Sequence, residues 1–400
     1  MRVLHTADWH FGRTLEGRSR LPEQEAFVDE LVSIVRDERI DLILLAGDVY
    51  DSVNPPAAAE GLYYDALARL SEGGSRQVAV IAGNHDHPDR VAAATPLAAR
   101  HGVRLIGLPQ AEAVTINVAR TGETAVIAAL PYPSEARLNE LLHAAMDEEA
   151  LRSAYSDRVG LLMRTMGAAF RQDTVNLAMS HIYALGGYES DSERPIQVGG
   201  AYTVDPASLR AGQQYTALGH LHRPQRVAGD ETIRYSGSPL AYSFSEAGQA
   251  KSVTLLDLSP GAEARPQELL LSSGRPLVRW EARGGLAEVH RWLDEGRDPL
   301  AWIELELWLT EALTLEQIGA LRASREGIVQ IRPVYASPEA DAEERDEKAL
   351  RGSLPPEELF RRFYRRQTGG AEADDALVAL FLELAGGAEA DEDEREESAS

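Results

Sequence analysis

The sequence predicts an α/β fold: a large layered domain of alternating strands and helices, then a smaller α+β domain and a C-terminal pair of helices. The first observation is that over about 270 residues short β-type runs alternate with stretches of helical periodicity. The second is a break at residues 272–276, after which a shorter alternation begins. The third is a hydrophobic share of 44% over 400 residues, which is enough to bury a sizeable core.

The large domain, residues 1–272, is predicted to contain a series of strands with helices between them. Strands are expected where short apolar runs occur, at 3–7, 41–46, 78–82, 103–106, 125–130, 175–179, 215–218, 233–235 and 252–258. Helices are expected at 22–39, 55–70, 88–100 and, as two helices, within 135–170. Pro22 would stand in the first turn of the first helix, where proline is tolerated.

The smaller domain, residues 273–336, is predicted from a β-α-β-α-β pattern. Its strands are expected at 277–281, 301–309 and 329–334, and its helices at 286–294 and 315–322. An acidic, weakly hydrophobic linker should follow at 337–352. Residues 353–386 should form two amphipathic helices, 354–367 and 373–385, and the acidic tail 387–400 is expected to be disordered.

Composition excludes several classes of protein. No apolar run approaches the ~18 residues of a membrane-spanning helix, so no membrane association is expected. The absence of cysteine excludes disulfides, thiolate zinc sites, iron–sulfur clusters and cysteine nucleophiles. The N-terminus lacks a basic and then apolar leader, so we expect a cytoplasmic protein.

The charge of the chain is strongly negative but uneven. The net charge is −24, which by itself argues against binding nucleic acid. However, residues 339–400 carry 19 acidic and 8 basic side chains, so the rest of the chain is much less acidic. Of the 40 basic residues only Lys251 and Lys348 are lysine. The overall charge therefore decides nothing, and a DNA-binding surface would have to be local.

Polar residues able to bind metals follow five of the predicted strands. The carboxyl ends of strands in an open α/β sheet meet at one edge, where ligand sites lie. We therefore expect one shared site. The clusters are Asp8-Trp9-His10, Gly47-Asp48, Gly83-Asn84-His85-Asp86, Ser180-His181 and Gly219-His220-Leu221-His222.

The candidate ligands are chemically compatible with one another and too many for one ion. They are oxygen and imidazole donors without thiolate, a set that favours manganese over copper. Two ions about 3.5–4 Å apart are the usual device for hydrolysing a phosphate ester. Asp48, after Gly47, is the best candidate to bridge them. The seven predicted ligands are Asp8, His10, Asp48, Asn84, His181, His220 and His222.

Each cluster also has an ordinary structural interpretation. An Asp-x-His sequence is common, Gly47-Asp48 is typical of a turn, and His220 with His222 could be a buried hydrogen-bonded pair. The combination in this order favours the metal site. His5 is predicted to be a core residue, whereas Asp51 and Asp86 are predicted to orient the ligands and His85.

These motifs resemble those of the calcineurin-like metallophosphoesterases. More closely, the segments 5–12, 46–51 and 218–225 are similar to the SbcD family, the nuclease subunits of bacterial SbcCD complexes. The segment 234–240, Arg-Tyr-Ser-Gly-Ser-Pro-Leu, resembles one distinctive of that family. The resemblance spans the chain to about residue 385. It implies a layered metallophosphoesterase β-sandwich flanked by helices, with a small α+β capping domain.

The resemblance also implies roles for the candidate residues. Asp8, His10, Asp48 and His222 would hold one manganese ion, and Asp48, Asn84, His181 and His220 the second, with magnesium or another divalent cation as an alternative. His85 would protonate the leaving oxygen or steady the phosphate, and Asp86 would fix its orientation. Archaeal relatives tend to have histidine where this chain has Asp51, which leaves a role of this position in strand handling open.

The architecture that the resemblance implies includes two partners. Residues 273–336 would cap the site and shape the access of DNA. The helices within 353–386 would dock on the coiled coil of the ATPase SbcC, although they could instead pack on their own domain. The chain has no phosphate-binding Gly-x-x-x-x-Gly-Lys motif, so ATP dependence would come from SbcC. Two nuclease and two ATPase subunits would form a nucleoid-associated heterotetramer.

The function that the resemblance implies is that of a manganese-dependent DNA nuclease. It would combine 3′→5′ double-strand exonuclease activity with endonuclease activity on single strands and hairpins, in DNA repair and recombination. Two alternatives remain: a small-molecule phosphodiesterase or phosphatase with the same metal centre, and a scaffold that has lost catalysis. The predicted capping domain and terminal helices disfavour the first, and the complete set of seven ligand positions disfavours the second.

Overall fold

The structure is a computed structural model that describes residues 1–145, 155–194, 202–335, 356–367, 373–375 and 377–382. The chain divides into two units, one of Met1–Leu307 with Leu313–Pro333 and one of Trp308–Ala312 with Val334–Ser400. Among the described residues, no helix has the length and apolarity that a membrane span requires. The predicted linker 337–352 and tail 387–400 lie outside the described residues.

Two six-stranded sheets form the centre of the first unit. The first sheet has the order β14 (Gln267–Leu270), β13 (Ser252–Asp257), β1 (Arg2–Thr6), β4 (Leu42–Ala46), β5 (Gln77–Ile81) and β6 (Val103–Ile106). The second has the order β11 (Gln225–Val227), β12 (Asp230–Tyr235), β10 (Tyr215–Gly219), β9 (Val175–His181), β8 (Glu123–Leu130) and β7 (Val114–Val118). Each sheet contains four adjacent parallel strands, which are β1, β4, β5 and β6 in the first and β12, β10, β9 and β8 in the second. The other two strands of each sheet pair antiparallel: β13 and β14 lie together at one edge of the first sheet, and β11 and β7 lie at the two edges of the second.

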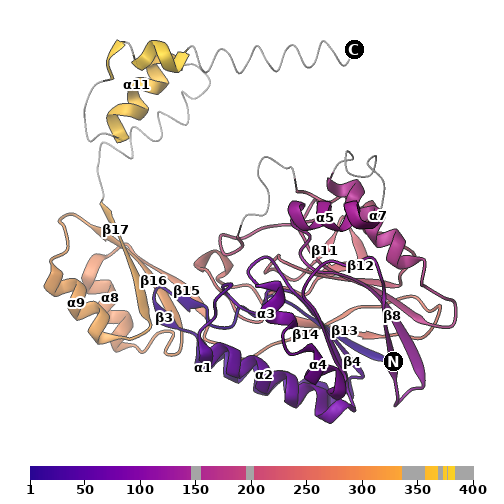
Figure 1. The fold of residues 1–400 in the computed structure, drawn as a ribbon. Coiled ribbons are helices and arrows are strands. Elements are labelled where there is room, and N and C mark those ends of the chain that lie inside the picture. Colours follow the sequence, from indigo (N-terminus) through magenta and orange to yellow (C-terminus); the bar gives the residue numbers. More distant parts are fainter. Residues whose placement is uncertain (146–154, 195–201, 336–355, 368–372, 376, 383–400) are drawn as a thin grey trace. The chain divides into compact units, whose positions relative to one another are not determined.

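The sheets pack face to face, with helices on both outer faces (Figure 1). Alternate side chains of one strand point to opposite faces. In β4, Leu42 and Leu44 therefore lie in the core between the sheets, whereas Ile43 and Leu45 pack on the helix side. Helices α1 (Leu21–Asp37) and α2 (Ala57–Ser71) cover the first sheet, and α5 (Glu135–Ala145) and α7 (Tyr155–Gly167) cover the second. The predicted layered β-sandwich flanked by helices is confirmed.

One buried polar contact joins the two sheets. His5 of β1 lies in the interior, as predicted, and is fully buried. Its Nδ1 lies 3.0 Å from the hydroxyl of Tyr215, and its Nε2 lies 3.1 Å from the carbonyl oxygen of Leu218, both on β10. Burial lowers the pKa of His5 to about 3, so the ring is neutral. The carbonyl must accept from Nε2–H, so Nδ1 accepts the Tyr215 proton.

The structure differs from the predicted elements mainly at the edges. The helix expected at 88–100 is broken into α3 (Pro88–Ala92), α4 (Thr95–Ala98) and a short 3₁₀ turn (Ala99–His101). Pro96 explains the break, since it has no N–H to continue the helix ladder. The strands β7, β11 and β14 were not predicted, nor was the small hairpin of β2 (Thr14–Leu15) and β3 (Arg18–Ser19). Three further 3₁₀ turns are present, Glu72–Gly74, Pro206–Leu209 and Phe244–Glu246.

The region predicted as the smaller domain contains a three-stranded sheet. Its strands are β15 (Leu277–Ala282), β16 (Trp302–Leu309) and β17 (Ile328–Tyr335), and its helices are α8 (Gly285–Asp294) and α9 (Leu315–Ser324). Strands β15 and β16 run parallel, as expected for a β-α-β unit. Glu23 of α1 accepts hydrogen bonds from Trp302 Nε1 at 2.9 Å and from the backbone N–H of Arg275 at 2.6 Å, which ties this region to the sandwich.

The second unit contains α11 (Pro356–Gln367) and a further helical segment at 377–382. Phe360 of α11 stacks on Phe381 with ring centroids 4.3 Å apart, and Arg361 pairs with Asp375 at 2.7 Å. The two C-terminal segments therefore contact each other, as an amphipathic helix pair would. The domain boundaries given above remain predictions.

Candidate metal centre

The seven predicted ligands converge at one rim of the sandwich. They follow or end β1, β4, β5, β9 and β10, because the carboxyl ends of the parallel strands of both sheets lie on that side. The two aspartates and four histidines of the set are at most 2% exposed, and Asn84 is half-buried. A chain of short distances connects all seven, as the following paragraphs describe.

The backbone is strained at four of these positions. Asp8, His10, Asp48 and His220 have φ values of 55°, 48°, 49° and 112°, in the left-handed region that disfavours side chains other than glycine. Neighbouring backbone hydrogen bonds enforce this conformation: Asp8 N–H donates to Gly47 O and His10 N–H to Asp48 O, both at 3.0 Å. Such strain concentrates at functional sites, where the surrounding structure over-determines it.

Two glycines next to the ligands leave no room for a side chain. A Cβ at Gly83 would lie 2.1 Å from Asp48 Oδ1, and a Cβ at Gly219 would lie 1.9 Å from the carbonyl oxygen of Ala46. The glycines that precede Asn84 and His220 therefore allow the strand ends of both sheets to approach closely.

Asp48 lies at the centre of the cluster. Its Oδ2 is 3.3 Å from His181 Nε2, 3.7 Å from His10 Nε2 and 4.0 Å from His85 Nε2. Its Oδ1 accepts the backbone N–H of His85 at 2.9 Å. The imidazoles that surround this carboxylate come from both sheets. Asp48 therefore lies where a ligand shared by two cations is expected.

One ring nitrogen of His181, Nε2, points towards oxygen atoms of Asn84 and Asp48. It needs a proton or a cation between itself and these atoms. Nδ1 of the same ring is 2.9 Å from the carbonyl oxygen of Ala46, which can only accept, so Nδ1 carries a proton. Its Nε2 then faces Asn84 Oδ1 at 2.8 Å and the carboxylate of Asp48. Burial disfavours the charged ring, but the charge and hydrogen bond of Asp48 raise the pKa of His181 to about 9. A proton and a metal ion would compete for this position.

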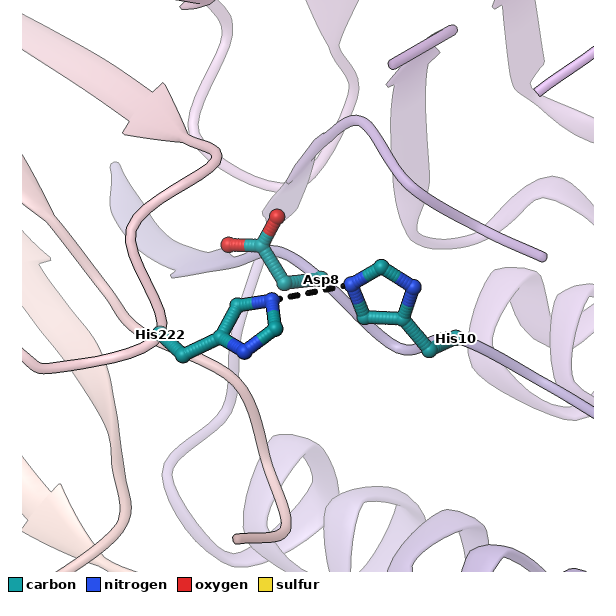
Figure 2. A group of neighbouring side chains, drawn as sticks. All are labelled: Asp8, His10 and His222. Carbon is teal, nitrogen blue, oxygen red and sulfur yellow. Dashed lines mark hydrogen bonds between the residues drawn. The ribbon is translucent and has the colours of Figure 1, made fainter. Parts of the chain in front are cut away.

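A second group of ligand atoms lies around Asp8, as Figure 2 shows. The ligand atoms of Asp8, His10 and His222 lie within 4.8 Å of one another, and Nε2 of His10 is 3.0 Å from Nε2 of His222. Nδ1 of His10 and Nε2 of His220 are buried without a hydrogen-bond partner among the described residues. Burial of such nitrogens is unfavourable unless something binds them, so this donor set fits divalent cations.

The expected pairing of His85 with Asp86 is wrong. Nδ1 of His85 donates to the backbone carbonyl of Asp51 at 2.8 Å, so Asp51 orients the ring through its main chain. The carboxylate of Asp86 instead accepts three backbone N–H groups, those of Val49, Tyr50 and Gly83, at 2.8–3.1 Å. These donors occupy both of its oxygens, so Asp86 fixes the loops that carry Asp48 and Asn84.

Sequence reasoning missed the polar residues behind the ligands. Gln24 donates to the carbonyl of His10 at 2.9 Å, although its position in a helix gave no sign of this. A second set of buried groups surrounds His222. The only available signal for that set was Lys251, one of two lysines in an arginine-rich chain. The set comprises Ser192, Glu193, Ser238, Tyr242, Glu246 and Lys251.

We predict that metal binding releases protons. At about pH 7.5 the raised pKa of His181 leaves its ring protonated, and burial also raises the pKa of Asp8 to about 7. A cation must displace these protons, so the apparent affinity should rise as the pH rises towards 9. Calorimetric titration with Mn²⁺ in two buffers of different ionisation enthalpy should give different heats, corresponding to about one proton or more. Equal heats in the two buffers would contradict this prediction.

We also predict that Gly83→Ala abolishes metal binding. The added methyl group would overlap Asp48 Oδ1 and its backbone nitrogen, so the carboxylate must move. Gly61→Ala is the matched control, because no described atom lies within 4 Å of its Cβ in α2. It should bind metal normally and gain about 0.5–1 kcal/mol of stability. Calorimetric stoichiometry checks both variants, and normal binding by Gly83→Ala would show that the close approach is not required.

Comparisons with known proteins agree with this geometry. The family model described as calcineurin-like phosphoesterase matches residues 1–224, and the one described as type 5 capsule protein repressor C-terminal domain matches residues 273–368. The chain is 55% identical over 390 residues to the SbcD component of the nuclease SbcCD of Bacillus subtilis (strain 168), covering 97% of this chain and 99% of that protein.

More distant relatives carry the same name. The protein of Rhodobacter capsulatus is 38% identical over 298 residues, which cover 71% of this chain and 72% of the relative. That of Escherichia coli (strain K12) is 30% identical over 325 residues, with coverages of 78% and 79%. With the metallophosphoesterase sandwich and its rim of candidate ligands, these matches establish that the chain belongs to the SbcD family of calcineurin-like phosphoesterases.

Proposed function

We propose that this chain is the nuclease subunit of an SbcC–SbcD complex and hydrolyses DNA phosphodiesters with two manganese ions. The observation that carries this proposal is the buried cluster of two carboxylates, four imidazoles and one amide, with Asp48 between the groups from the two sheets. With two divalent cations bound, such a centre activates a water molecule and offsets the charge of the phosphate in the transition state.

The distances support a division of the ligands into two sets that share Asp48. Asp8, His10 and His222 form one compact group, and Asp8 also lies in a group with Asp48 and His181, so Asp8 adjoins both sets. Asn84 and His181 are in direct contact, and the ring of His220 lies 5.6 Å from that of His181 between centroids. Oxygen and imidazole donors without a thiolate favour manganese, and magnesium would be the weaker alternative at the histidine-rich positions.

His85 is the proposed proton donor to the leaving oxygen. Its Nδ1–H is held by the carbonyl of Asp51, so only Nε2, which faces Asp48, is turned towards the cluster. To deliver a proton from Nε2 the ring starts doubly protonated. It ends as the neutral Nδ1–H form that the Asp51 carbonyl already stabilises. Asp86 acts indirectly, by holding the loops around it.

A polar cavity beside the centre favours a polymeric substrate over a small molecule. It has a volume of about 350 Å³ and lies between the sandwich and the β15–β17 sheet. Arg13 lies over the ring of Tyr242 at 5.1 Å and also contacts Asp51 at 3.3 Å. Arg279 and Arg332 line the opposite side, where both pair with Glu304, at 2.5 and 3.3 Å, so a phosphate would have to compete with this carboxylate. Guanidinium groups extending away from the metal ligands would contact phosphates that flank the scissile bond, as exonuclease action on duplex ends and endonuclease action on hairpins require.

The C-terminal helices are the proposed contact with SbcC. Phe363 and Leu380 are 58% and 51% exposed although the helix pair already has its own aromatic contact. Exposed apolar side chains on an otherwise charged helix fit the surface of a coiled coil.

For the pairing of two nuclease subunits we propose the groove between α2 and α4. The groove measures about 580 Å³ and is lined by Tyr64, Leu67, Ala94, Leu97 and other residues, none of them acidic or basic except His101. Leu97 is 70% exposed. In a chain of net charge −24, an uncharged patch is a surface that two copies can bring together about a two-fold axis without like-charge repulsion.

His85→Gln should separate catalysis from metal binding. Glutamine can still donate to the Asp51 carbonyl but cannot transfer a proton, so kcat on a hairpin DNA should fall roughly 10²–10⁴-fold. Mn²⁺ stoichiometry measured by calorimetry should stay at two. Assays use the complex with its ATPase partner, with a cyclic nucleotide as the alternative substrate. Unchanged kcat, or preferred cleavage of the cyclic nucleotide, would contradict the proposal.

Leu97→Glu should separate the two nuclease copies. A carboxylate on each copy would be brought towards its counterpart across the two-fold axis, so light scattering should report a monomer at concentrations where the unmodified chain is a dimer. Leu185→Glu, at a 58% exposed leucine outside the groove, is the control and should remain dimeric. A dimeric Leu97→Glu variant would place the contact elsewhere.

A further inference from the structure

A chain of buried hydrogen bonds ends on the ring of His222, on the side away from the other ligands. It connects Lys251, Glu246 and Ser192, which are 8%, 0% and 6% exposed. We propose that these three residues are positioning residues that hold His222 in its Nδ1–H tautomer. Nε2, which points to the metal centre, is then unprotonated and can act as a metal ligand. The proposal rests on the assignment of His222 as a metal ligand.

All three ammonium protons of Lys251 have acceptors. Nζ forms an ion pair with Glu246 Oε2 and donates to the carbonyl oxygen of His222 at 2.9 Å and to Ser238 Oγ at 3.0 Å. A tetrahedral ammonium group matches three separate acceptors, whereas the planar fork of arginine does not. This geometry gives a physical reason for a lysine at one position of a chain whose basic residues are otherwise almost all arginine.

Glu246 is surrounded by donors. Its Oε1 accepts the hydroxyl of Ser192 at 2.6 Å and the backbone N–H of Tyr242 at 3.0 Å, while Oε2 takes the Lys251 ammonium. An ion-paired carboxylate has no proton to donate, so Glu246 is the acceptor in each of these hydrogen bonds.

The hydrogen bond from Ser192 to Glu246 also determines how Ser192 contacts His222. A serine hydroxyl has one proton, and here it is committed to Glu246. Ser192 Oγ lies 2.5 Å from Nδ1 of His222 and can only accept at this contact, so Nδ1 carries the ring proton. The lone pair of the ring then lies on Nε2, which accepts Nε2–H of His10 at 3.0 Å in the metal-free protein and would bind a cation once that proton is displaced. A hydrogen bond to the far nitrogen is the common way in which proteins fix a metal-binding histidine.

The backbone of His222 is held separately from its ring. Glu193 Oε1 accepts its N–H at 2.8 Å, and its carbonyl oxygen accepts from Lys251 and from the N–H of Ser238 at 3.1 Å. Loss of the Ser192 hydroxyl should therefore free the tautomer without displacing the main chain. The family-specific segment 234–240, which the metal ligands leave unexplained, supplies Ser238 to this arrangement.

The test uses the full chain labelled with ¹⁵N at histidine and three variants. Ser192→Ala removes the acceptor at Nδ1, and Ser192→Thr restores it. Tyr215→Phe removes a buried hydroxyl that contacts His5 and is the control for a general loss of stability. Ser192→Ala is chosen over a change at Lys251, because the latter would leave the Glu246 charge buried and unpaired. The readouts are the ¹⁵N shifts of the His222 ring, assigned against a His222→Gln spectrum, and calorimetric titration with Mn²⁺.

The expected result is a single Nδ1–H tautomer of His222 in the unmodified chain, in Ser192→Thr and in Tyr215→Phe, and a mixture of tautomers in Ser192→Ala. One of the two Mn²⁺ affinities should fall about 10–100-fold in Ser192→Ala only. An unchanged tautomer in Ser192→Ala, or equal losses in Ser192→Ala and Tyr215→Phe, would overturn the proposal. If the unmodified chain bound no Mn²⁺, the proposed function would fail, while the tautomers of the metal-free protein would still test the positioning.

Discussion

Everything at the rim of this sandwich depends on the burial of the Asp48 carboxylate among imidazoles from both sheets. The carboxylate has protein partners in His85 N–H and His181, but Nδ1 of His10 and Nε2 of His220 have no hydrogen-bond partner in the described part of the chain. Two features bring these atoms close together. The backbone is strained at four of the predicted ligands, and Gly83 and Gly219 have no side chain to keep the neighbouring strand ends apart. Protonated His181 supplies positive charge beside Asp48 in the metal-free protein, and divalent cations would take that place under the proposed function.

The two sheets must keep their relative position for this to work, since each contributes about half of the donors. The apolar core between the two sheets holds them together. His5 adds a directional contact from β1, which leads to Asp8, to β10, which leads to His220. Groups that lie behind the candidate metal ligands set the orientation of individual histidine rings through hydrogen bonds. They are the carbonyl of Ala46 for His181, the carbonyl of Asp51 for His85, and Ser192 for His222. Each leaves one ring nitrogen directed at the centre.

The sequence was sufficient to predict the inner strands and the seven converging donors, but little of what surrounds them. Buried parallel strands such as β4 are continuous apolar runs, and the residues that follow them inherit a common location from the sheet. Edge strands such as β7 and β14 are short and partly exposed, contain polar residues, and become strands through pairing with a neighbouring strand rather than through an apolar run of their own. The role expected for Asp86 was wrong for a similar reason: which donors a carboxylate meets depends on loops that are distant in sequence. Ser192 and Glu246 were invisible because their partners lie 30 and 54 residues away.

The central claim is that two cations share Asp48. The most direct measurement is anomalous diffraction from a crystal of the full chain soaked in Mn²⁺. The account predicts two peaks about 3.5–4 Å apart with the Asp48 carboxylate between them. Asp8, His10 and His222 should surround one peak, and Asn84, His181 and His220 the other. A single peak, or two peaks of which neither contacts Asp48, would contradict it.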